Sequence, residues 1–190
     1  GDFRHPAIVI REKNGSRISD FRYSGHQVTD GKPELPGLPA TYCEDPGEAQ
    51  TLHLFLEDPV TGVEIELLYT LFSDMPVLTR SARIVNSGEF AVDIEQAMSF
   101  CLDLPDSDYE MIQFSGSWAR ERIPEKNHLA RGIQGVESLR GHSSHQHNPF
   151  IVLKRPNTDE AGGEAIGFSL VYSGNFLAEV QGDNYDEIGR

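Results

Sequence analysis

Hydrophobic and polar positions alternate with a period of two through much of this chain. Leu52, Leu54 and Leu56 lie on one side of such a run, and every second residue from Val63 to Leu71 is apolar. Residues 58–62 between the two runs contain a proline and a glycine, which are typical of a turn. We therefore expect two antiparallel strands with one buried face each.

Further runs of the same kind continue along the chain. We expect a hairpin of 7–11 with 17–23 around Asn14-Gly15, and a strand pair of 77–85 with 90–100. Apolar residues do not recur at helical spacing over three turns, so long helices are not expected. The sequence predicts an all-β fold, an antiparallel β-sandwich or barrel with few or no helices. Later strands are expected at 150–154, 165–172 and 176–181.

Two segments interrupt the alternation. Residues 29–41 contain three prolines and two glycines, too many for the interior of a strand. The segment 103–148 is long, and its hydrophobic and polar positions mostly do not alternate. We interpret it as a functional or interface-forming excursion.

The net charge limits the kinds of partner that the protein is expected to bind. Thirty acidic residues oppose sixteen basic ones over 190 residues, giving a formal charge of −14 that is spread along the sequence. Such a charge repels nucleic acid and anionic membrane surfaces, so neither is an expected partner. No stretch approaches the roughly 20 apolar residues of a membrane-spanning helix.

Cys43 and Cys101 are the two cysteines, and they lack the C-x-x-C spacing of a structural zinc site. We expect two thiols in a reducing compartment and therefore a cytoplasmic protein, with a single disulfide as the open alternative.

Trp118 is the only tryptophan, and it follows Ser115-Gly116-Ser117, which we interpret as a turn. Arg120, Glu121 and Arg122 come directly after it, whereas core tryptophans usually lie in apolar runs. Tryptophan contacts amphipathic ligands such as sugars through an apolar ring with a polar handle. Two interpretations stay open: Trp118 is a sugar-contacting residue, or it caps the edge of the sandwich.

The histidines at 142, 145 and 147 are the candidate metal ligands. On an extended backbone His145 and His147 would point the same way. Zinc needs three or four ligands, and no further ligand is placed by spacing. We interpret them as hydrogen-bonding residues that brace a loop, and we expect no metal. The acidic stretch 102–110 lacks the glycine and glutamate of a calcium loop and is interpreted as a surface turn.

Catalytic motifs are missing from the sequence. It contains no G-x-S-x-G elbow, no phosphate-binding glycine loop and no cysteine nucleophile with a spaced partner, and we expect no cofactor. Glycoside hydrolysis needs two carboxyl groups, but nothing in the sequence pairs any two of its acids.

Eight segments, in order along the chain, resemble the N-terminal domain of bacterial α-galactosidases of glycoside hydrolase family 36. The first five are Asp2-Phe3-Arg4 with Pro6-Ala7, Gly15-Ser16 to Asp20, Gly31-Lys32-Pro33, Gly37-Leu38-Pro39-Ala40-Thr41-Tyr42, and Thr79-Arg80-Ser81. The others are Trp118-Ala119-Arg120-Glu121-Arg122, residues 143–150 and residues 167–176.

The resemblance implies that residues 1–190 are a single β-supersandwich domain that lacks its first and last strands and precedes a (β/α)₈ catalytic barrel. It implies a parent enzyme that removes terminal α-galactose from melibiose or raffinose with retention of configuration. The two catalytic aspartates of such enzymes lie in the barrel, so we expect this chain alone to be inactive, with no catalytic residue of its own.

The resemblance also implies a role for Trp118. Many of these enzymes are homo-tetramers in which the matching tryptophan reaches the active site of a neighbouring subunit and contacts substrate. Trp118 is therefore the one substrate-binding residue that we carry over. Roles for Arg120 and His145 are not carried over, and some relatives have glutamine in place of His147.

Two other functions stay open. The chain could be a free-standing carbohydrate-binding sandwich that uses Trp118 as its platform. It could also be a mutarotase-like enzyme with His145 or His147 as the acid/base, which requires a carboxylate within reach.

Overall fold

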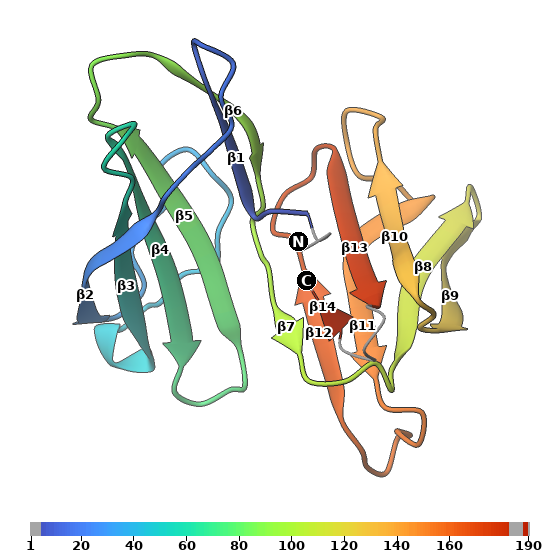
Figure 1. Cartoon of the computed structure of the whole chain (residues 1–190). Coiled ribbons are helices and arrows are strands. Elements are labelled where there is room, and N and C mark those ends of the chain that lie inside the picture. Colours follow the sequence, from blue (N-terminus) through green and yellow to red (C-terminus); the bar gives the residue numbers. More distant parts are fainter. Residues whose placement is uncertain (1–4, 183–187, 190) are drawn as a thin grey trace. The chain divides into compact units, whose positions relative to one another are not determined.

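The computed structural model describes residues 5–182 and 188–189. They form two compact units, the first spanning residues 5–101 and the second beginning at Leu102 (Figure 1). Both units consist of antiparallel strands, and the described residues contain one short 3₁₀ helix, η1 (Pro46–Glu48). The expected all-β antiparallel fold is confirmed. No helix in these ranges is long and apolar enough to span a membrane.

The first unit contains a four-stranded sheet and a two-stranded sheet. The order of the larger sheet is β2-β3-β4-β5, with β2 (Arg22–Asp30), β3 (Ala49–Glu57), β4 (Val63–Phe72) and β5 (Leu78–Asn86). The smaller sheet pairs β1 (Ile8–Glu12) with β6 (Val92–Ala97). The proline-rich segment after Asp30 lies outside the strands, as predicted, up to the start of η1.

The predicted β3–β4 hairpin is confirmed, but two other predicted pairings are wrong. Residues 7–11 do not pair with 17–23, because β1 pairs with β6 instead. Residues 77–85 do not pair with 90–100, because β5 pairs with β4. The periodicity located these strands, but it carried no information about which distant strand each one would meet.

The turn at Asn14-Gly15 does form, although the hairpin does not. The backbone N–H of Ser16 donates to Asn14 Oδ1 at 2.8 Å, and that of Glu12 donates to the Ser16 carbonyl at 2.9 Å. Beyond the turn, Arg17 Nε lies 2.6 Å from Glu95 on β6. An ion pair between side chains, and not a second strand, therefore connects the segment after the turn to the β1–β6 sheet.

The buried residues of β4 lie on one face of the strand in its first half and on the opposite face in its second half. Val63 and Ile65 are buried as predicted, but Leu71 on the same face is 62 % exposed. Leu68 and Thr70, on the opposite face, are buried instead. The pairing of β4 with β3 and β5 has no bulge, so the strand keeps its orientation and the covering layer differs from end to end. The expectation of one buried face from Val63 to Leu71 is wrong beyond Ile65.

Asp58 fixes the turn between β3 and β4. Its side chain is fully buried, and its carboxylate accepts backbone hydrogen bonds from Val60 at 2.9 Å, Asp20 at 3.3 Å and Thr61 at 3.4 Å. Burial alone would raise the pKa of Asp58, but these donors together lower it below the usual aspartate value. One carboxylate therefore joins the turn to the segment that precedes β2.

The second unit is a sandwich of two four-stranded sheets. One sheet has the order β12-β11-β8-β9, with β8 (Glu110–Ser117), β9 (Arg120–His128), β11 (His147–Lys154) and β12 (Ala165–Ser169). The other has the order β10-β13-β14-β7, with β7 (Asp103–Leu104), β10 (Gly132–Ser138), β13 (Phe176–Gly182) and β14 (Ile188–Gly189). A shared apolar core joins them, consisting of Tyr109, Met111, Val136, Ile151, Leu153, Phe176 and Val180.

The segment 103–148 is not an irregular excursion. It contains β7, β8, β9, β10 and the start of β11, and Trp118 lies within it. Alternation was hard to see because every residue of β9 is exposed. The later strands are close to their predicted positions, and β13 pairs with β10 and β14.

We expect Asp58→Asn to lower the free energy of unfolding by about 1–3 kcal/mol at pH 7, because it disturbs buried backbone donors. The lowered folded pKa means that the ionised carboxylate stabilises the protein above its unfolded pKa of about 4, and that this is lost as pH falls through the folded value. Urea denaturation at pH 7 and at pH 3 measures both effects. The exposed Asp74→Asn is the matched control, and a pH-independent difference between Asp58→Asn and wild type would contradict the assignment.

We expect Leu153→Ala to lower the free energy of unfolding by about 2–5 kcal/mol, because it leaves a cavity in the core of the second unit. Leu153 is 2 % exposed, whereas Leu177 is 60 % exposed and serves as the control. Leu177→Ala should change stability by about 0.5 kcal/mol or less. Equal losses for the two variants in denaturant titrations would show that Leu153 is not part of a close-packed core.

Candidate functional site: the Trp118 hairpin

Strands β8 and β9 form a hairpin (Figure 1). Trp118 lies between them along the chain, at the tip of this hairpin. Ser117 pairs with Arg120, so the turn consists of Trp118 and Ala119. The turn predicted at Ser115-Gly116-Ser117 is therefore wrong, since these residues end β8. The Trp118 side chain is 84 % exposed, which excludes the interpretation that it caps the sandwich edge. An aromatic ring this open is available to a ligand.

The backbone of the hairpin tip has an unusual conformation. Ala119 has φ of 62° and Arg122 has φ of 55°, and they are the two non-glycine residues of the described ranges in the left-handed region. This region is unfavourable for residues with a Cβ, by about 1–2 kcal/mol each. Such conformations persist where surrounding contacts impose them, and they cluster at functional sites.

Gly116 lies where three backbone segments meet. A Cβ on this residue would overlap the carbonyl oxygen of Arg120 and come within 2.9 Å of Glu121 Cα and 3.1 Å of the His145 carbonyl. The Gly116 N–H donates to the Gln146 carbonyl at 3.2 Å. The pairing of β8 with β9 shifts register between Ser115 and Ser117, because two residues of β9, Glu121 and Arg122, lie opposite Gly116. The extra residue of this β-bulge is therefore on β9. Only glycine fits here without moving a backbone.

Glu125 connects the two strands below the tip. Its carboxylate accepts hydrogen bonds from Ser115 Oγ and from Gln113 Nε2, the latter at 2.9 Å. The hydrogen bond from Ser115 lowers the pKa of Glu125 most, and that from Gln113 follows. Desolvation of the carboxylate opposes this shift, and the nearby His147 lowers the pKa further.

The segment 140–147 braces the hairpin from the other side. The Ser143 N–H donates to the Ser173 carbonyl at 2.7 Å, and the Gly141 N–H to Asn175 Oδ1 at 2.7 Å. His147 begins β11 opposite Ser115. The backbone of this segment supports the hairpin through the hydrogen bond from Gly116 to Gln146, whereas the predicted bracing by histidine side chains finds no support at His147. The Nδ1 atom of His147 is buried without a hydrogen-bond partner.

The structure gives no support to metal binding or to a histidine acid/base. Within residues 5–182 and 188–189, no group of three or more His, Cys, Asp or Glu residues is placed to hold an ion. Glu125 influences His147 electrostatically, but its carboxylate is engaged by Ser115 and Gln113. No disulfide joins Cys43 and Cys101.

The carboxyl groups with a clearly shifted pKa are stabilised in their ionised form. Lys154 Nζ lies 2.7 Å from Glu110 and lowers its pKa, and the guanidinium of Arg155 does the same for Asp106. A glycosidase acid catalyst needs the opposite, a raised pKa. In the described ranges every carboxyl group with a clearly shifted pKa is shifted down, namely Asp58, Glu95, Asp106, Glu110 and Glu125.

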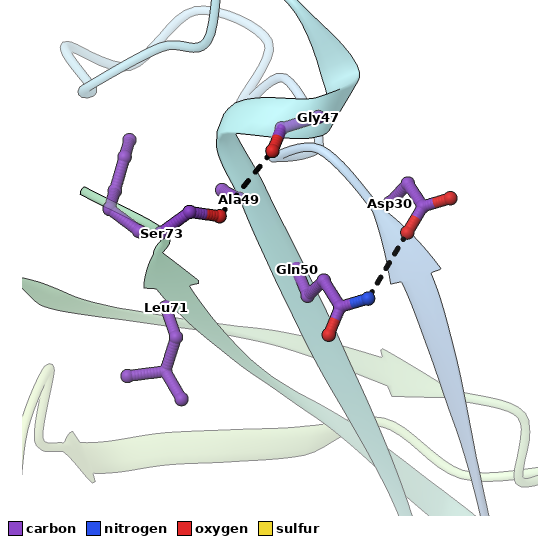
Figure 2. A pocket seen from close by; sticks show the side chains of 7 residues that line it. Asp30, Gly47, Ala49, Gln50, Leu71 and Ser73 are labelled. Atoms are coloured by element: carbon purple, nitrogen blue, oxygen red, sulfur yellow. Dashed lines mark hydrogen bonds between the residues drawn. The ribbon is translucent and has the colours of Figure 1, made fainter.

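A hollow at one end of the β2–β5 sheet lies in the first unit, away from the hairpin along the chain. Figure 2 shows Gln50 Nε2 donating to Asp30 at 3.3 Å and Ser73 Oγ to the Gly47 carbonyl at 3.4 Å. Leu71, Ala49 and Phe72 also line it. Asp30 is the only carboxylate among the lining residues, so the hollow lacks the acid pair of a glycoside hydrolase.

The sequence pointed to Trp118 but not to the residues that hold it. Gly116 was interpreted as part of a turn, although a glycine in a strand also signals a bulge or a close backbone approach. Glu125 carried no signal, because its partners on β8 depend on the register of the hairpin. The left-handed residues Ala119 and Arg122 are not types that usually adopt this conformation.

Comparison with known proteins identifies the family. The family model of the glycosyl hydrolase family 36 N-terminal domain matches residues 1–189. The α-galactosidase AgaA of Geobacillus stearothermophilus is 48 % identical over 184 residues, which are 97 % of this chain and 25 % of that enzyme. The α-galactosidase 1 of Pediococcus pentosaceus is 43 % identical over 187 residues, 98 % of this chain and 26 % of that enzyme. The chain thus spans about a quarter of the length of these relatives.

Crystal structures agree with this match. That of AgaA superimposes with a TM-score of 0.96 at 47 % identity, covering 98 % of this chain and 26 % of that one. Variants of AgaA have been crystallised in complex with raffinose and with stachyose. The sequence match over the whole chain and the common fold show that this chain belongs to the N-terminal domain family of glycoside hydrolase family 36.

Proposed function

We propose that this chain is the non-catalytic N-terminal domain of a homo-tetrameric α-galactosidase, and that Trp118 contacts α-galactosides such as melibiose and raffinose in the active site of a neighbouring subunit. Both units of the chain belong to this one domain, and the catalytic barrel is not part of the 190 residues. The observation that carries the proposal is the exposed Trp118 ring on a braced hairpin, in a chain that belongs to this family.

Three further observations support this proposal. The chain matches about a quarter of several α-galactosidases along nearly its whole length. Raffinose and stachyose, which are bound by variants of AgaA, contain terminal α-galactose and therefore suit the predicted substrate class. The shifted carboxyl groups are ionised anchors and not acid catalysts, which suits a domain whose chemistry occurs elsewhere.

The size of the Trp118 contribution follows from its surface. A tryptophan offers about 150–250 Å² of buriable area, and a sugar covers about half of it. At about 25 cal/mol per Å², this contact stabilises bound substrate by at most about 2–3 kcal/mol. The residue thus strengthens a site that other groups complete.

We expect Trp118→Ala, in the full-length enzyme that contains this domain, to lower kcat/KM for raffinose about tenfold to a hundredfold. The loss follows from the contact area removed. Phe90→Ala is the control, since Phe90 is another exposed aromatic, in the first unit. Steady-state kinetics on both variants provide the comparison, and a loss below about threefold for Trp118→Ala would refute the substrate contact.

Mixed tetramers test whether Trp118 serves a neighbouring subunit. Subunits with Trp118→Ala retain an intact barrel, and subunits with an inactivated barrel nucleophile retain Trp118. Co-assembly of the two should raise the activity per intact barrel above that of the Trp118→Ala homo-oligomer, because some intact barrels then receive a tryptophan from a neighbour. An unchanged activity would mean that Trp118 acts within its own subunit or not at all.

The free-standing carbohydrate-binding module is the second candidate, and the exposure of Trp118 favours it. A titration of this chain with galactose, melibiose and raffinose, followed by tryptophan fluorescence, separates the two candidates, because Trp118 is the sole tryptophan. We expect no change from the folded chain, since the barrel completes the site. A saturable change at millimolar sugar would establish a self-contained platform.

A further inference from the structure

We propose that Gly116 and Glu125 are positioning residues that hold the backbone carrying Trp118 in one conformation and so determine where its ring is presented. The value of this conformation for substrate binding rests on the proposed function, whereas the conformation itself is a property of the hairpin. Neither residue lies in the two-residue turn, so both would act on the ring through the strands that carry it.

Gly116 fixes the hairpin relative to the rest of the second unit. Its missing side chain lets Arg120 on one side and the His145–Gln146 backbone on the other approach β8 closely. All three atoms that an added Cβ would meet belong to the backbone, so no side chain could rotate away. An alanine would have to displace the start of β9, and Arg120 is two residues from Trp118.

Glu125 fixes the two strands relative to each other. Glu125 pairs with Gln113, and Ser115 is the next β8 residue on the same face of the sheet. The carboxylate therefore accepts hydrogen bonds from two successive β8 side chains on that face. Ser115 precedes Gly116. The two positioning residues therefore hold adjacent points of β8, beside the bulge of β9.

The two left-handed residues lie where the hairpin departs from a regular ladder. Ala119 is the second residue of the turn, and Arg122 is one of the two β9 residues opposite Gly116 at the bulge. Gly116 and Glu125 provide the contacts that lie nearest to them in the ladder of β8 and β9. These contacts resist a change in the turn and the bulge, and so they keep the backbone that carries Trp118 in place.

Tryptophan fluorescence anisotropy of this chain tests the proposal directly. We expect wild-type Trp118 to show little fast motion beyond rotation of the ring about its own bonds, and Gly116→Ala and Glu125→Ala to increase the amplitude of the fast decay at least about twofold. Glu125→Gln should remain close to wild type, because an amide can still bond to Ser115 and Gln113.

Two controls keep this test decisive. Gly25→Ala changes a glycine of β2 that has no atom within 4 Å of the added Cβ, and it should leave the anisotropy decay unchanged. Glu125 is exposed, so Glu125→Ala should fold even if Gly116→Ala does not. A wild-type decay in every folded variant would overturn the proposal.

A double-mutant cycle in the full-length enzyme separates this inference from the proposed function. We expect Gly116→Ala to lower kcat/KM about threefold to thirtyfold, and to have almost no effect in a Trp118→Ala background. An equal loss in both backgrounds would overturn the positioning role. An inert Trp118→Ala would refute the proposed substrate contact instead, and the anisotropy measurement would still decide whether Gly116 and Glu125 hold the backbone at Trp118.

Discussion

Strand β8 is the constraint on which the second unit depends. It pairs with β11 along one edge and with β9 along the other, and Met111 near its start lies in the core shared by both sheets. Its last residues lead into the turn that exposes Trp118, and Gly116 among them lies opposite the bulge of β9. The burial of apolar side chains at one end of the strand thus determines the position of an open aromatic ring at the other. A change in the register of β8 would affect both together.

Sequence periodicity predicted strands more reliably than it predicted their partners. The β3–β4 hairpin was predictable because a short turn joins two clearly alternating runs. The pairing of β1 with β6 was not, because the chain between them forms the larger sheet of that unit. The candidate site shows the same difference between local patterns, which the sequence reveals, and distant contacts, which it does not. Trp118 was conspicuous among polar neighbours, but Gly116 depends on a backbone segment, at His145, that no local pattern connects to it.

The acidic surplus has two separate physical roles. Most of the acidic residues in the described part of the chain are exposed, and their negative charge repels polyanions. A few carboxylates are instead engaged within the fold, such as Asp58 in the β3–β4 turn and Glu110 against Lys154. Each of these is stabilised in its charged form, which makes it a good structural anchor and a poor proton donor.

Strand β9 has a consequence for how this domain can change. Every one of its residues is exposed, and it forms the outer edge of its sheet, where Pro124 offers no N–H to an added strand. Its side chains are little buried in this chain, so most of them, apart from Glu125, can vary without a large loss of stability. Evolution could therefore retune the surface beside Trp118, or an engineer could exchange it, while the core that supports it stays the same.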